Sequence, residues 1–118
     1  MILVDTSVWV DHFRNGNAEL QNLLRNNEVL MHPLIVGELS CGSMQNRREI
    51  LCLLQDLPEA NVAEHNEVLG LIERRRLWGH GVGWVDVHLL ASALLTRSSI
   101  WTLDRQLYRL ASSLKLSQ

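Results

Sequence analysis

The chain has 118 residues, of which 47% are hydrophobic and 20% are charged, and its formal net charge is -2. This composition excludes a disordered or fibrous protein and predicts one compact domain over residues 1–118, while the charge argues weakly against a protein that coats nucleic acid by bulk electrostatics. No apolar run reaches the roughly 18 residues that a membrane-spanning helix needs, and no basic segment precedes an apolar stretch at the N-terminus, so we expect a cytoplasmic protein with no membrane partner.

The first half of the chain predicts strands that alternate with helices. Thr6 or Ser7 can cap the first helix, Pro33 suits the first turn of the helix that carries LIVGELSCG, and Pro58 ends the last helix of this half. In chain order we expect a strand at 1–4, helices at about 6–14 and 18–25, a strand at 28–31, a helix from 33 and a helix at 47–57. Cys41 and Cys52 lie in these helical segments without metal-type spacing, so we expect packed free thiols.

The second half continues the alternation, and its helix over 85–96 is apolar on most sides, which suggests a central position. In chain order we expect a short strand at 60–63 (ANVA), helices at 64–78 and 85–96, a strand at 99–103, a helix opened by Asp104 and a last edge strand at 114–116 (LKL). Strands alternating with helices in a chain of this size predict an α/β fold, with a central, mostly parallel sheet flanked by helices on both faces.

Four acidic residues stand among apolar neighbours, whereas most other acids keep polar company. Asp5 follows MILV and Asp104 follows IWTL, so both should lie just past the carboxyl end of a strand. Glu38 in LIVGEL and Asp86 in GWVDVHLL should lie early in helices that can start on the same side of the sheet. Because ligands of such sheets bind outside the carboxyl ends of the strands, we expect all four carboxylates to converge there.

Four converging carboxylates repel one another unless a counter-charge is present, and a divalent cation supplies it. Ligation by oxygen alone favours Mg²⁺ or Mn²⁺ over zinc. The chemistry that follows is phosphodiester hydrolysis, in which a metal-activated water attacks and the metal stabilises charge on the phosphate. The predicted catalytic and metal-binding residues are therefore Asp5, Glu38, Asp86 and Asp104.

Each acid also has a purely structural interpretation. Asp5 and Asp104 can cap the helices that follow them, and Glu38 can lie on a solvated helix face. Asp86 can be a first-turn residue that the positive end of the helix dipole favours. Three hydroxyl side chains beside the acids also have two interpretations. They can bind a carboxylate, a metal-bound water or a phosphate, or they can have only a structural role, as helix caps or as a hydroxyl on a strand. These are Thr6, Ser7 and Thr102.

Four stretches in this order, DTSVWVDHF, LIVGELSCG, GVGWVDVHLLASALL and IWTLDRQL, resemble the PIN-domain ribonucleases, specifically the VapC-type toxins of bacterial toxin-antitoxin modules. The resemblance covers essentially the whole chain. It implies a PIN-like fold and an Mg²⁺- or Mn²⁺-dependent endoribonuclease. It assigns the acidic site to Asp5, Glu38, Asp86 and Asp104, with Thr6, Ser7 and Thr102 at the polar positions beside them.

The resemblance also implies the partners. Such toxins cleave structured RNA at exposed single-stranded loops, often tRNA or ribosomal RNA, and form homodimers. A VapB-type antitoxin wraps the toxin and blocks its site, and the complex binds its own operator DNA through the antitoxin.

Other functions fit the residues less well or remain open. A haloacid-dehalogenase-type phosphatase needs a second acid two residues after the first, where this chain has Ser7, and a receiver domain needs a lysine near the phosphoryl group, whereas the only lysine is Lys115. Two alternatives stay open: a catalytically inactive PIN-like module that binds RNA or protein, and an RNA-processing nuclease without an antitoxin. Four intact acids disfavour the first, because a like-charge cluster destabilises a module that does not use it.

Overall fold

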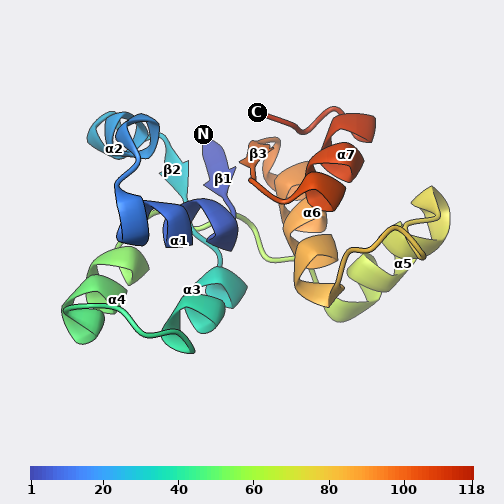
Figure 1. Cartoon of the computed structure of the whole chain (residues 1–118). Coiled ribbons are helices and arrows are strands. Elements are labelled where there is room, and N and C mark those ends of the chain that lie inside the picture. The colour runs from blue at the N-terminus through green and yellow to red at the C-terminus, as the bar shows by residue number, and fades with distance from the viewer.

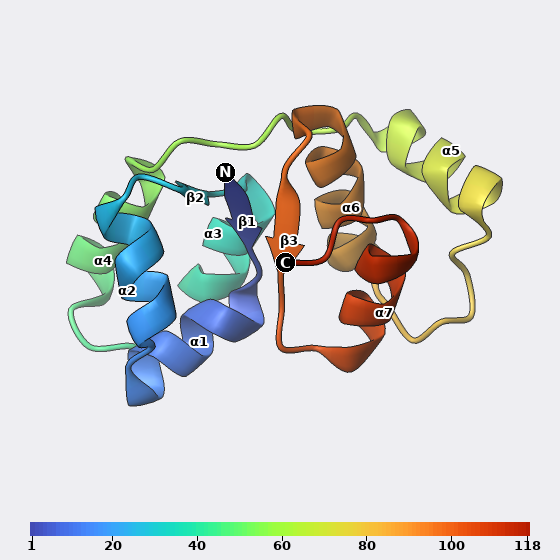
Figure 2. The same cartoon turned by 90° about the horizontal axis from the view of Figure 1, so that it is seen from above.

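The computed structural model describes all 118 residues and contains a three-stranded parallel sheet with helices on both sides of it (Figure 1). The strands are β1 (Ile2–Val4), β2 (Val29–Leu30) and β3 (Ser99–Trp101). The helices are α1 (Thr6–Asn15), α2 (Ala18–Arg25), α3 (Pro33–Ser40), α4 (Arg47–Gln55), α5 (His65–Arg75), α6 (Trp84–Thr96) and α7 (Arg105–Ser113). Seen from above, α1 to α4 gather at one end of the molecule and α5 to α7 at the other, with the strands between them (Figure 2). The predicted α/β architecture is confirmed.

The strand order β2-β1-β3 places the N-terminal strand at the centre of the sheet. Leu3 pairs with Leu30 on one side and with Ile100 on the other, and all three residues of β1 are buried. Because the strands are parallel, their carboxyl ends lie at one edge of the sheet. The backbone N–H of Asp5 continues the pairing by donating to the carbonyl oxygen of Trp101 at 2.9 Å. The segments that follow β1 and β3 therefore start side by side.

The core is one cluster of 27 buried apolar residues, and α6 runs through it. Helix α6 buries six of its thirteen residues, including Leu89, Leu90 and Ala93, which confirms its predicted central position. Two side chains on opposite elements connect inside this core: the Nε2 atom of His32, which precedes α3, lies 3.0 Å from the Oγ atom of Ser92 on α6. This contact fixes α3 against α6.

Two predicted strands are wrong as extended elements. The segment 60–63 forms no strand, because only Glu59, just before it, bridges to Met31, and the N–H of Asn61 donates to the side chain of Thr96 on α6 instead. The segment 114–116 likewise forms no strand, and a single bridge between Ser117 and Ile100 takes its place. In both places the chain makes a single bridge at the outer side of the sheet.

The remaining differences concern element ends and the two thiols. Helix α5 ends at Arg75, short of the predicted residue 78, because Arg76 takes a left-handed conformation with φ 52° that ends the helix. Cys41 and Cys52 are free, as predicted, but both are exposed rather than packed, because they lie on the outer sides of the α3 end and of α4. No helix has the length and apolar character needed to span a bilayer.

Candidate functional site

Asp5 lies directly after β1, and it is buried, with 6% of its surface exposed. Hydrogen bonds hold its side chain in place. One of its carboxylate oxygens, Oδ2, accepts hydrogen bonds from the hydroxyl of Ser7 at 2.7 Å, from the hydroxyl of Thr102 at 2.8 Å and from the backbone N–H of Ser7 at 3.3 Å. The last of these caps α1, so the structural interpretation of Asp5 is correct as far as it goes. The other oxygen, Oδ1, has no hydrogen-bond partner in the protein.

Asp104 is tied to the same network through the backbone. Its N–H donates to the hydroxyl of Thr102 at 3.0 Å, and the N–H of Leu103 donates to the hydroxyl of Ser7, also at 3.0 Å. The Oδ1 atom of Asp104 caps α7 by accepting from the N–H of Leu107 at 2.9 Å, which leaves Oδ2 without a partner. The two acids that follow β1 and β3 are therefore connected by two hydroxyl groups.

Glu38 joins this site from α3. The hydroxyl of Thr6, at the start of α1, donates to the Oε1 atom of Glu38 at 2.7 Å across 32 positions of sequence. Glu38 is exposed, and its Oε2 atom has no partner. The prediction put Glu38 early in its helix, whereas it is the sixth residue of α3, in the second turn. It still reaches the site because α1 and α3 pack against each other.

Asp86 is the third residue of α6 and completes the set. Its Oδ2 atom accepts the N–H of Gly83 at 3.3 Å, and its Oδ1 atom has no partner. Burial raises the pKa of the Asp86 carboxyl, the Gly83 hydrogen bond opposes that rise, and the negative charges of Asp5, Asp104 and Glu38 raise the pKa further. The other three acids therefore lie close enough to Asp86 for their negative charges to raise the pKa of its carboxyl.

The four acids share a feature that suits a hard cation. Each uses one oxygen for a hydrogen bond within the protein and keeps the other free, which provides four anionic oxygen donors and no softer ligand. No three histidine, cysteine or acidic side chains lie close enough together to hold an ion directly. Ligation by all four would therefore run partly through water, and Mg²⁺ usually keeps several waters in proteins. With water as an intermediary, the residues fit such an ion.

Sequence reasoning missed one charged residue beside this site. Arg14, in the last turn of α1, lines a cavity of about 120 Å³ together with Glu38. No sequence motif places positions 14 and 38 together; only the packing of α1 on α3 does so.

Comparison with known proteins agrees with this architecture. The family model described as PIN domain matches residues 2–113. Two curated relatives, each named Ribonuclease VapC32 and found in Mycobacterium tuberculosis strains CDC 1551 / Oshkosh and ATCC 25618 / H37Rv, are 49% identical over 108 residues, covering 91% of this chain and 87% of theirs. The chain therefore belongs to the PIN-domain family and, within it, to the VapC-type proteins.

Proposed function

We propose that this protein is an Mg²⁺- or Mn²⁺-dependent endoribonuclease and the toxin of a toxin-antitoxin module. The observation that carries the proposal is the set of four carboxylates, each with one free oxygen, around the carboxyl ends of β1 and β3. The relatives carry the name ribonuclease, which supports RNA as the substrate.

In this mechanism the hydroxyl groups fix the acids, and the acids would hold a divalent cation. Ser7 and Thr102 hold Asp5, and Thr6 holds Glu38. A divalent cation, when bound, supplies the positive charge that offsets the carboxylates and the Lewis acidity that activates a water and stabilises the phosphate. In-line attack of water on the scissile phosphate expels the 3′ oxygen, so the products are a 5′-phosphate and a 3′-hydroxyl.

Membership of the VapC-type proteins supports a proposal for the substrate and the inhibitor. We propose that the substrate is a structured RNA cut in a single-stranded loop, such as tRNA or ribosomal RNA. A VapB-type antitoxin blocks the acidic site, and the complex binds operator DNA through the antitoxin.

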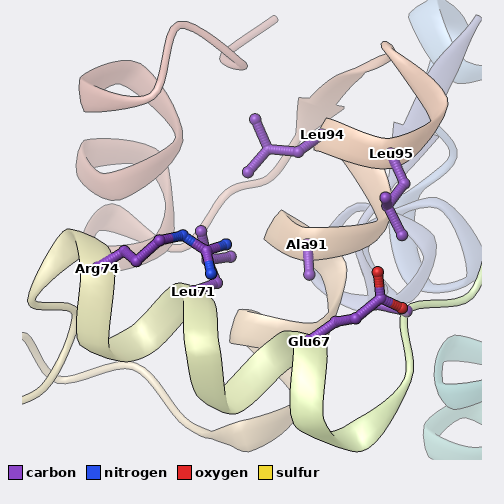
Figure 3. Close-up of a pocket in the computed structure, with 7 residues that line it drawn as sticks. Glu67, Leu71, Arg74, Ala91, Leu94 and Leu95 are labelled. Atoms are coloured by element: carbon purple, nitrogen blue, oxygen red, sulfur yellow. The ribbon is translucent and has the colours of Figure 1, made fainter.

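We also propose that the protein forms a homodimer through the face shared by α5 and α6, where a groove of about 160 Å³ opens (Figure 3). Ala91, Leu94 and Leu95 of α6 lie across this groove from α5. Glu67 and Arg74 stand on the same face of α5, two helical turns apart. A two-fold axis that crosses α5 between Gly70 and Leu71 exchanges their positions, so each copy would offer Glu67 to the partner's Arg74. The groove lining carries one acid and one cation and is otherwise apolar, and the guanidinium of Arg74 folds back over Gly70.

The hydrolase is tested by incubating total cellular RNA with purified antitoxin-free protein in Mg²⁺ or Mn²⁺ and sequencing the new 5′ ends. We expect discrete cuts with 5′-phosphates that disappear with EDTA and in Asp86→Asn. A 2′,3′-cyclic phosphate at the cut would mean that the RNA's own 2′-hydroxyl attacks, which contradicts the water mechanism. No cleavage by the folded, metal-supplemented protein would favour a binding module.

A further inference from the structure

Two neighbouring cavities beside the acidic site share four lining residues, and together we call them the Arg14 groove. The first, about 120 Å³, is bounded by Glu38 at the acidic site, and the second, about 280 Å³, reaches Gln45 and Asn46. Both are lined by Phe13, Arg14, Ser43 and Met44. The groove therefore starts at one of the four acids and leads away from them between α1 and the loop that joins α3 to α4.

Arg14 is an exposed cation in this groove, and the carboxylate of Glu38 lies on the wall of the same cavity. No hydrogen bond or salt bridge involves its side chain. It stands nine residues after Asp5, about 13 Å along the axis of α1. An RNA strand that approaches four carboxylates is repelled by them, so a cation on its path contributes attraction that the acids cannot. Arg14 is therefore placed to bind a backbone phosphate at some distance from the scissile one.

The far end of the groove carries free carboxamides. Asn46 has a left-handed backbone, with φ 55° and ψ 38°, and although it precedes α4 its side chain makes no capping hydrogen bond. Gln45 beside it makes no hydrogen bond within the protein either. Carboxamides both donate and accept, which suits the hydrogen-bonding edge of a nucleobase.

The loop that carries these carboxamides is held in place. The guanidinium of Arg47 donates two hydrogen bonds, of 2.7 and 3.2 Å, to the carbonyl oxygen of Ser40. This contact joins the end of α3 to the start of α4, so the wall of the groove is fixed before a ligand arrives. A fixed wall lowers the entropy lost on binding.

We propose that the Arg14 groove binds single-stranded RNA on one side of the scissile phosphate. Arg14 binds a backbone phosphate, and Gln45 and Asn46 contact the adjacent base. The inference rests on the proposed function and adds the residues that would set affinity and base preference.

The test is binding of a fluorescent single-stranded RNA of about 12 nucleotides and randomised sequence to the full chain carrying Asp86→Asn, in EDTA, by anisotropy at several salt concentrations. Adding Arg14→Gln should weaken binding about tenfold at low salt. It should also reduce the slope of log affinity against log salt by about 0.7, the contribution of one phosphate contact to a single strand. Arg14→Lys should largely restore the slope.

Two further variants separate the contacts. Asn46→Gly keeps the left-handed backbone accessible and removes the carboxamide, so it should weaken binding without changing the slope. Arg25→Gln is the matched control, because Arg25 is also an exposed arginine in the last turn of a helix, but outside the groove. It should change neither affinity nor slope. Thermal unfolding of each variant should match the Asp86→Asn background.

The outcomes are distinguishable from a failure of the hydrolase. Absence of RNA binding, or an unchanged slope in Arg14→Gln, overturns the groove assignment even where wild-type protein cleaves RNA with metal. A reduced slope without any cleavage by wild-type protein supports the groove and contradicts the hydrolase.

Discussion

At the scale of single residues, the hydroxyl groups of Ser7 and Thr102 each perform two tasks. Each donates its hydrogen to Asp5 and each accepts a backbone N–H from the segment after β3. A hydroxyl can do both at once because it has one donor and two acceptor positions. These two side chains therefore fix the distance between the strand ends as well as the orientation of Asp5.

The acids differ in how much the fold depends on them, which gives a prediction for metal-free protein. Asp86→Asn should raise the melting temperature in EDTA, because it removes a charge that burial and three other acids disfavour and loses only one long hydrogen bond. Asp5→Asn should lower the free energy of unfolding by about 2 kcal/mol, because three hydrogen bonds lose their charged acceptor.

Thermal unfolding of both variants in EDTA and in Mn²⁺ checks this prediction. Both should lose most of the stabilisation that the ion gives to the wild type. Equal shifts in the two variants without metal would mean that the hydrogen bonds of Asp5 and the charge of Asp86 do not control stability as described.

The sequence could locate the acids but not the bonds between site residues. Asp5 and Asp104 were predictable because an apolar strand ends directly before each. The partners of Asp5 were not, because Thr102 lies 97 positions away and no local pattern records such a contact. The position of Arg14 beside the site could not be predicted for the same reason, because it depends on the packing of α1 against α3.

At the scale of elements, His32 connects the start of α3 to α6. Its Nδ1 accepts the N–H of Leu34 and caps α3, so the ring proton is assigned to Nε2, which then donates to Ser92. The ring is fully buried. Burial lowers the pKa of His32 to about 4, and the charge of His88 also lowers it. The neutral ring is thus part of the fold.

Stability should therefore fall with acid. Unfolded His32 takes up its proton near the ordinary pKa of 6.5, whereas folded His32 does so only near 4. Between these values the unfolded chain binds more protons, so the free energy of unfolding decreases as pH falls, by about 3 kcal/mol over the full window. Above pH 6.5 this contribution is fully present.

Urea denaturation of wild-type protein and of His32→Asn at about pH 7 and about pH 5 measures the effect. Asparagine retains an acceptor for the cap of α3 but does not titrate, so the variant should lose less stability on acidification. The same loss in both proteins would contradict the role of His32.

Element types followed the sequence closely, and element ends did not. The helices and the three strands were visible from apolar periodicity and capping residues. The segment 60–63 forms no strand because the backbone N–H of Asn61 donates to the hydroxyl of Thr96 on α6. This tertiary contact outweighs the local β preference.

At the scale of the whole molecule, the charge pattern of the dimer face allows a complementation experiment. Arg74→Glu places acids opposite one another in the proposed dimer, and Glu67→Arg places cations opposite one another, so each variant alone should raise the dimer dissociation constant at least about 100-fold. Mixing the two variants should restore a heterodimer, because each copy then faces the opposite charge. Light scattering after size-exclusion chromatography measures the molar mass of each variant and of the mixture, which distinguishes monomer from dimer.

A control separates assembly from helix stability. Glu67 also accepts the N–H of Glu64 at the start of α5, so Glu67→Arg removes part of a cap worth about 1 kcal/mol. Glu67→Gln keeps that acceptor and removes only the charge, so it should weaken the dimer while the unfolding transition stays near that of the wild type. Monomeric wild-type protein, or failure of the mixed variants to associate, would exclude this face.

The single bridges at the two outer strands have a consequence for aggregation and partner choice. Pro58 and Ala60 satisfy the outward backbone groups of Met31, just beyond β2, and Leu116 and Gln118 satisfy those of Ile100 in β3. An edge whose outward groups are paired, as at Ile100, offers little template for a strand from another chain, which protects β3 against edge-to-edge stacking. A protein that binds at the edge of β3 must then contact side chains instead of adding a strand, so its affinity can be altered one side chain at a time.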